Sequence, residues 1–120
     1  MEKKTVVLGA STNPERYSNL AVHKLKAHHH PVIAIGKKEG MIEDTPIITE
    51  HPPVDDVDTV TIYLNPKHQE EYYDYILSLK PKRIIFNPGA ENPELKKIAL
   101  DNDILPQEAC TLVLLSTGQF

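Results

Sequence analysis

The sequence predicts an α/β domain in three layers, a doubly wound parallel sheet of about five strands with helices on both faces. Short apolar segments alternate with amphipathic helical segments along the chain, which is the pattern of a parallel sheet with crossover helices. The first apolar segment, Thr5–Leu8, leads directly into the small residues Gly9, Ala10 and Ser11. A chain of 120 residues can bury one core, so we expect a single domain over residues 1–120.

The expected strands are short and mostly apolar, as strands covered on both faces should be. They span residues 5–8, 31–35, 59–64, 83–86 and 104–105, and a further short edge strand is an option over 47–49. Right-handed crossovers predict the sheet order 3-2-1-4-5 for strands numbered along the chain. Ligands of such sheets bind at the carboxyl ends of the strands, where the order reverses. We therefore expect a site in the crevice between the first and fourth strands.

Capping residues mark the expected helix starts. Ser18 is expected to begin a helix that runs to about Ala27. Asn65-Pro66 and Asn92-Pro93 each combine a capping side chain with a proline at the first helical position. Residues 111–115 form either a closing helical turn or a further edge segment. The intervening stretch 37–53 is the least regular part, and connections of this length are often functional or mobile.

Composition and charge exclude several classes of protein. The chain is 40% hydrophobic and 25% charged, with a net charge of −4, which argues against a protein built to neutralise nucleic-acid phosphates. No apolar run approaches the roughly 20 residues needed to cross a bilayer, and residues 1–4 lack the features of a signal peptide. The single cysteine, Cys110, indicates a reducing compartment. We expect a cytoplasmic monomer or homodimer with no membrane or nucleic-acid partner.

The turn after the first strand has the features of a phosphate-binding turn. Gly9 and Ala10 allow close approach of backbone to a ligand, and the following helix start offers free N–H groups and the positive end of its dipole. Arg16 adds a forked donor for phosphate oxygens. The alternative is a tight strand–helix turn with a solvated arginine. Gly9 alone does not distinguish a phosphate-binding turn from an ordinary strand–helix turn, because the pattern G-x-G-x-x-G is absent.

The end of the second strand discriminates better between ligands. A site for NAD would carry Asp or Glu there to hold the ribose hydroxyls, whereas this chain has Gly36-Lys37-Lys38. Two lysines suit an extra phosphate on the ribose, as in coenzyme A or NADP. The alternative is a solvated loop, and the position of the pair in the expected topology favours the phosphate.

These residues together resemble a known family. The string G-A-S-x-x-P-x-R-x-S, formed here by Gly9, Ala10, Ser11, Pro14, Arg16 and Ser18, is similar to the signature of small stand-alone CoA-binding domain proteins. That family shares its Rossmann-like fold with the nucleotide-binding domain of the succinyl-CoA ligase alpha subunit. The resemblance covers nearly the whole chain, including residues 54–58 and 110–113. It departs at Asn87-Pro88, where the family often has an aromatic residue and Gln, and at Glu108-Ala109, where Asp-Arg is common.

The resemblance implies a site for coenzyme A or an acyl-CoA, with NADP as a less favoured ligand. The turn 9–18 would hold the pyrophosphate, Lys37 or Lys38 would meet the ribose phosphate, and residues 64–66 would flank the adenosine or the pantetheine arm. The departures concern the pantetheine end. The expected site residues are Gly9, Ala10, Ser11, Pro14, Arg16, Tyr17, Ser18, Gly36, Lys37, Lys38, Leu64, Asn65, Pro66, Asn87, Pro88 and Gly89.

Three further groups of residues are weighed as sites and set aside. His28-His29-His30 lacks partners at metal-ligand spacing, and favourable charge at a helix C-terminus is the plainer account. Cys110 is a candidate reactive thiol, although buried cysteines more often behave as small apolar residues. The acidic residues of 54–58 precede the third strand, away from the expected site, which favours a solvated loop.

Three functions are consistent with these residues. The first is a binding module for coenzyme A or an acyl-CoA without chemistry of its own, since no nucleophile–base pair is apparent at the crevice. The alternative is a minimal NAD(P)-dependent oxidoreductase or nucleotide-using enzyme, for which Tyr63 and His68 are the nearest proton donors. The third is a regulatory protein whose occupancy controls an unidentified protein partner, with the lysine loop as its moving part.

Overall fold

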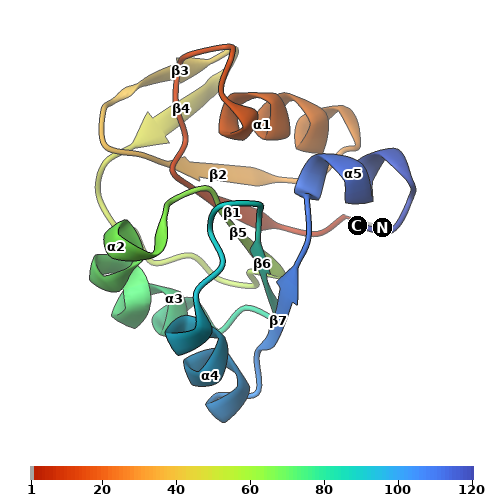
Figure 1. Cartoon of the computed structure of the whole chain (residues 1–120). Helices are drawn as coiled ribbons and strands as arrows, with labels where there is room; N and C mark the ends of the chain where they lie inside the picture. Colours follow the sequence, from red (N-terminus) through yellow and green to blue (C-terminus); the bar gives the residue numbers. More distant parts are fainter. Residues whose placement is uncertain (1) are drawn as a thin grey trace.

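The computed structural model of the protein describes residues 2–120, and a seven-stranded sheet lies between two layers of helices (Figure 1). The expected α/β Rossmann-like fold class is confirmed. The strands are β1 (Thr5–Leu8), β2 (Val32–Ile35), β3 (Gly40–Ile42), β4 (Thr45–Ile48), β5 (Thr59–Ile62), β6 (Arg83–Phe86) and β7 (Leu105–Glu108). The helices are α1 (Tyr17–Ala27), α2 (Pro66–Gln69), the 3-10 helix η1 (Glu70–Tyr72), α3 (Tyr73–Leu79), α4 (Pro93–Asp101) and α5 (Thr111–Ser116).

The strand order is β3-β4-β2-β1-β5-β6-β7, which corrects two details of the expected sheet. The sheet has seven strands rather than five, and the strand expected over 59–64 lies beside β1, with Val6 opposite Val60, rather than beyond β2. The place beyond β2 belongs to β4, where the sequence suggested only a short edge strand, and β3 pairs with it in an antiparallel hairpin. All four residues of β5 are buried, which suits a central strand covered on both faces.

Helices cover the two faces of the sheet unequally. α1 and α5 lie on one face (Figure 1), over a small core that includes Val7, Val22, Leu25 and Leu115. The other face carries α2, η1, α3 and α4 over a larger core, in which Leu8, Ile76, Phe86 and Leu95 are fully buried or nearly so. Because the connection after β1 crosses one face and the connection after β5 crosses the other, the chain diverges between these strands. This divergence leaves a crevice at the carboxyl ends of β1 and β5. The expected crevice between the strands over 5–8 and 83–86 is therefore wrong, because β5 separates β1 from β6.

The helix starts agree with the sequence at two positions and differ at one. The side chains of Asn65 and Asn92 cap α2 and α4, each followed by proline. In α1, however, the N-cap is Arg16 rather than Ser18, and the Arg16 side chain makes no capping hydrogen bond. Ser18 is buried within the first turn, so it is not free to cap. Residues 111–116 are helical, which resolves the two alternatives for that segment.

Candidate functional site

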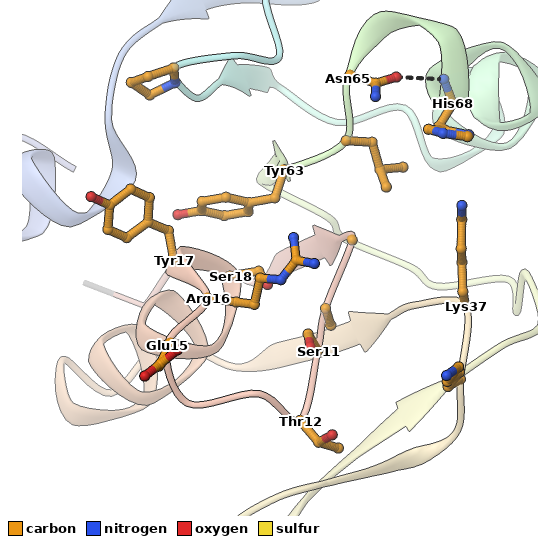
Figure 2. A pocket seen from close by; sticks show the side chains of 15 residues that line it. Ser11, Thr12, Glu15, Arg16, Tyr17, Ser18, Lys37, Tyr63, Asn65 and His68 are labelled. Carbon is orange, nitrogen blue, oxygen red and sulfur yellow. Dashed lines mark hydrogen bonds between the residues drawn. The ribbon is translucent and has the colours of Figure 1, made fainter.

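A cavity of about 720 Å³ opens at the carboxyl ends of β1 and β5. Four segments of the chain contribute to it: the turn between β1 and α1, the loop after β2, the segment after β5 and the loop after β6 (Figure 2). Its lining residues are Gly9, Ala10, Ser11, Thr12, Glu15, Arg16, Tyr17, Ser18, Lys37, Lys38, Tyr63, Leu64, Asn65, His68 and Pro88. The crevice between diverging strands is the usual ligand site of an open parallel sheet.

The turn after β1 is held against the end of β2 by its backbone. Gly9 has φ of +91°, a conformation that glycine adopts without strain, and the N–H groups of Gly9 and Ala10 both donate to the carbonyl of Ile35 at 2.9 Å. A Cβ added at Gly36 would lie 2.3 Å from the carbonyl oxygen of Ala10. Gly36 is therefore required for this close approach, although it lies behind the cavity wall.

The N-terminus of α1 meets the cavity without a side-chain cap. Its N-cap, Arg16, has an extended backbone with φ −78° and ψ 139°. The side chains around the turn bond elsewhere, since Ser11 Oγ accepts from Asn13 N at 3.1 Å and Asn19 Nδ2 donates to Ser11 O at 2.9 Å. The first N–H groups of a helix have no acceptor within the helix. This eleven-residue helix thus presents donors and a positive dipole end that suit an anion.

Positive side chains surround this helix end. Arg16 and Lys37 both extend into the cavity (Figure 2), and Lys38 also lines it. Among the described residues that line the cavity, Glu15 is the only acid. The lining thus has the opposite sign to the protein, whose net charge is −4. Concentrated charge of one sign in a concave site attracts ligands of the other sign, and here the ligand would be anionic.

Tyr63 lines the cavity with its ring and not with its hydroxyl group. The hydroxyl oxygen is buried without a hydrogen bond of good geometry, although it lies near the hydroxyls of Thr111 and Thr61. Burial raises the pKa of Tyr63 to about 12, so the phenol stays neutral at physiological pH. Because this hydroxyl is buried, it does not offer a ligand in the cavity the proton donor that an oxidoreductase would need.

Asn87 lies beneath the cavity and joins three elements. Its Nδ2 donates to Thr61 Oγ1 at 2.7 Å and to the carbonyl of Ile62 at 2.9 Å, and its Oδ1 accepts from Thr111 N at 2.8 Å. The residue is only 1% exposed. Asn87 therefore ties β6 to β5 and to the start of α5, rather than flanking the cavity as the sequence had led us to expect.

Most residues expected at the site share this cavity, and some do not. Those that line it are Gly9, Ala10, Ser11, Arg16, Tyr17, Ser18, Lys37, Lys38, Leu64, Asn65 and Pro88. Pro14, Gly36, Pro66, Asn87 and Gly89 lie outside the lining. Thr12 and Glu15 line it without having been expected there, although both lie within the turn 9–18. Tyr63 and His68, which the sequence suggested only as proton donors, also line it. Tyr63 directly follows β5, and His68 lies in α2.

The other sequence candidates occupy separate places. His28 Nδ1 lies 2.9 Å from the carbonyl of Lys24, and His30 Nδ1 accepts from Lys3 N at 3.0 Å. Within residues 2–120, no group of three or more His, Cys, Asp or Glu side chains is arranged to hold a metal ion. Cys110 is partly buried. Asp55, Asp56 and Asp58 line a second cavity at the amino end of the sheet. No helix in the described part of the chain is long and apolar enough to cross a membrane.

Comparisons with known proteins agree with this geometry. A family model described as a CoA binding domain matches residues 3–116. A crystal structure of an uncharacterized protein is 52% identical, with a TM-score of 0.98 over 100% of this chain and 99% of that one. A hypothetical protein from Pyrococcus horikoshii OT3 is 22% identical, with a TM-score of 0.87 over 97% and 83% of the two chains. A protein from Thermus thermophilus is 20% identical, with a TM-score of 0.83 over 99% and 91%. A search of curated protein sequences found no match.

Proposed function

The chain belongs to the CoA-binding domain family, and we propose that it binds coenzyme A or an acyl-CoA in the cavity between β1 and β5 without catalysing a reaction. One observation carries this proposal. An uncapped helix N-terminus and three cationic side chains meet at a cavity in a protein of net negative charge. Coenzyme A has two separate anionic centres, a pyrophosphate and a phosphomonoester on its ribose, and the cavity offers donors for both.

The pyrophosphate is assigned to the turn 9–18. Its oxygens would accept from the free N–H groups at the start of α1 and from the Arg16 guanidinium, whose forked donors match phosphate geometry. The absent Cβ of Gly9 lets the ligand approach the backbone closely. Ser11 and Ser18 border the same place.

The ribose phosphate is assigned to Lys37 and Lys38. Both lysines are exposed and border the cavity at the end of β2, which is where the ribose of a dinucleotide lies in this fold. An acidic residue there would hold ribose hydroxyls, and two lysines favour a phosphate instead. This assignment distinguishes coenzyme A from NAD.

The arm of the ligand is assigned to the apolar wall of the cavity. Leu64 and the Tyr63 ring follow β5, Pro88 follows β6, and Tyr17, which is 70% exposed, stands at the start of α1. These groups suit the uncharged pantetheine chain and an acyl group. They set no defined size for the acyl group.

A role in binding alone is supported by the arrangement of the polar side chains. The Tyr63 hydroxyl is buried beneath the cavity. Among the described residues, no hydrogen bond joins the His68 imidazole to a hydroxyl or thiol, and the only bond of His68 at the site is from its backbone N–H to Asn65. A nucleophile needs a base within hydrogen-bonding reach, and the cavity presents no such pair.

Calorimetric titration with coenzyme A, acetyl-CoA, NADP and NAD tests the proposal. We expect both CoA forms to bind and NAD to give no response. Lys37→Gln should weaken CoA binding about tenfold, as the loss of a charge-assisted contact implies. Lys82→Gln is the matched control, because this exposed lysine lines the cavity at the other end of the sheet. A response to NAD or NADP with none to either CoA form would overturn the proposal.

A further inference from the structure

We propose that His68 and Lys37 together bind the ribose phosphate of the ligand, and that this pair makes ligand binding stronger in mildly acidic solution. The inference rests on the proposed function, because it assigns a second half to the ribose-phosphate subsite. It adds a residue from the opposite layer of the fold and a pH dependence that the lysines alone would not produce.

The geometry places the two side chains on opposite walls of the cavity. Lys37 lies in the loop after β2, and His68 lies in α2, which follows β5. Both line the cavity, and the Lys37 side chain extends toward the His68 ring (Figure 2). A phosphate group between them would meet an ammonium on one side and an imidazole N–H on the other. Neither segment would make such a two-sided subsite alone.

The position of His68 is set by bonds that leave its ring free. Its backbone N–H donates to Asn65 Oδ1 at 3.2 Å, which is the capping bond of α2. The next residue, Gln69, is buried and its Nε2 donates to the carbonyls of Leu64 and Ala90 at 2.8 Å. The start of α2 is thus anchored on both sides of His68. Because the backbone of His68 is anchored, this segment loses little freedom when it meets a ligand.

The charges around His68 favour proton uptake together with ligand binding. Arg16, Lys37 and Lys38 line the same cavity, with Glu15 as the acid in the lining. On its own segment, Lys67 precedes it and Glu71 follows one turn later. Glu91, in the loop after β6, accepts from Gly89 N at 2.9 Å and does not line the cavity. A phosphate dianion bound beside the His68 ring would favour the protonated imidazole over the neutral one. Binding should therefore take up a proton at neutral pH.

The remaining histidines are placed where they cannot act on the ligand directly. Of the histidines in the described chain, only His68 lines the cavity. His23 pairs with Glu43 at 3.2 Å, and His51 stacks on Tyr72 with ring centroids 4.7 Å apart. His28 and His30 lie beyond the far end of α1, where they bond to Lys24 and Lys3. A histidine effect on ligand binding is therefore assigned to His68.

The phosphate limits the pH range over which the effect appears. The second ionisation of a phosphomonoester has a pKa of about 6, so the ligand itself loses charge in more acidic solution. A proton taken up on binding makes binding tighter as the pH falls, until the phosphate is itself protonated. Affinity should therefore rise from about pH 8 to a maximum near about pH 6.5 and then decline. For a partly exposed pair, the rise should be about threefold to fivefold.

The experiment is a calorimetric titration of coenzyme A at about pH 8 and about pH 6.5, repeated with dephospho-CoA, which lacks the ribose phosphate. We expect the wild-type protein to bind CoA more tightly at the lower pH and to bind dephospho-CoA equally at both. His68→Gln should abolish the rise with CoA. His28→Gln is the matched control and should keep it. Repeating the titration in buffers of different ionisation enthalpy should show proton uptake by the wild-type protein but not by His68→Gln.

The outcomes separate this inference from the proposed function. Absence of CoA binding at either pH would overturn the proposed function, and the inference with it. Binding of CoA with the same pH dependence in His68→Gln and the wild-type protein would overturn the inference alone. An equal rise with dephospho-CoA would also overturn it, because the phosphate would then not be the group that His68 meets.

Discussion

The two ends of the sheet have cavities of nearly equal volume, about 720 Å³ at the carboxyl end and about 760 Å³ at the amino end, but their chemistry differs. The carboxyl-end cavity combines a glycine turn and an uncapped helix start with Arg16, Lys37 and Lys38. The amino-end cavity mixes both signs of charge: Glu2, Asp55, Asp56 and Asp58 against Lys4, Lys80 and Lys82. The first cavity has three cationic side chains against one acid, Glu15, whereas the second has four acids against three lysines.

This difference shows that the volume of a cavity does not by itself indicate which end of the sheet suits a ligand. In this sheet β1, β5, β6 and β7 are each followed by a helix start at the carboxyl end, where free N–H groups and the positive dipole end face that edge. The amino end receives the helix ends instead. α3, for example, ends there with Lys80 in the left-handed conformation at φ 49°. The direction of the chain therefore makes one end of the sheet suitable for anions.

The largest effect is expected for Gly36→Ala, which would place a Cβ 2.3 Å from the Ala10 carbonyl oxygen. Something in the tightly packed turn must move, at a cost of about 3 kcal/mol, and CoA affinity should fall at least about tenfold. Urea denaturation and calorimetry would measure the two effects. Gly118→Ala is the control, because its Cβ meets nothing within 4 Å. It should cost about 1 kcal/mol for its positive φ and leave binding unchanged. Wild-type affinity in Gly36→Ala would contradict the role of the turn.

A second effect is expected in alkaline solution from Tyr63. Its folded-state pKa of about 12 lies above the value of about 10 in an unfolded chain, so the unfolded state loses its proton first. The free energy of unfolding should therefore fall between about pH 10 and about pH 12, by about 2 kcal/mol. Tyr63→Phe should reduce this fall in urea denaturation while Tyr72, Tyr73 and Tyr75, whose pKa values burial also raises, keep part of it. Identical pH profiles for the variant and the wild-type protein would contradict the burial of the hydroxyl.

A smaller effect, with opposite signs for stability and binding, is expected at Arg16. Its extended backbone suits a capping serine, so Arg16→Ser should raise the free energy of unfolding of the ligand-free protein by about 1 kcal/mol. The same change should lower CoA affinity about tenfold, because it removes the guanidinium and fills the helix start. Arg16→Ala should lose affinity without gaining stability. If Arg16→Ser binds CoA as the wild-type protein does, the uncapped helix start is not the anion site.

Local signals in the sequence were enough to predict several elements. Asn65-Pro66 and Asn92-Pro93 mark helix starts because the capping bond and the proline ring act on neighbouring residues. The mostly apolar segments 5–8 and 83–86 form strands, because a strand in the centre of the sheet is covered on both faces and needs apolar side chains there. The turn 9–18 and the lysines after β2 reach one cavity because consecutive strands of a parallel sheet end at the same edge.

Other features depend on contacts between distant parts of the chain. The predicted place of β5 in the sheet was wrong. The hairpin 40–48 occupies the position beyond β2, and β5 pairs with β1 on the other side. Asn87 looked like a residue of the cavity from its position after β6, but bonds to Thr61 and Thr111 bury it. Neither the place of β5 nor the burial of Asn87 could be predicted from the spacing of nearby residues.

The sequence by itself determined the α/β class, the glycine turn after the first strand and the positive charge after β2, because each follows from residue types close together in the chain. Only the tertiary structure decided that Arg16 leaves α1 uncapped at the cavity, that the Tyr63 hydroxyl is buried, and that His68 faces Lys37 across the cavity. These relations depend on how segments on the two faces of the sheet are placed relative to one another. Their geometry is set by packing and strand order, which local patterns do not encode.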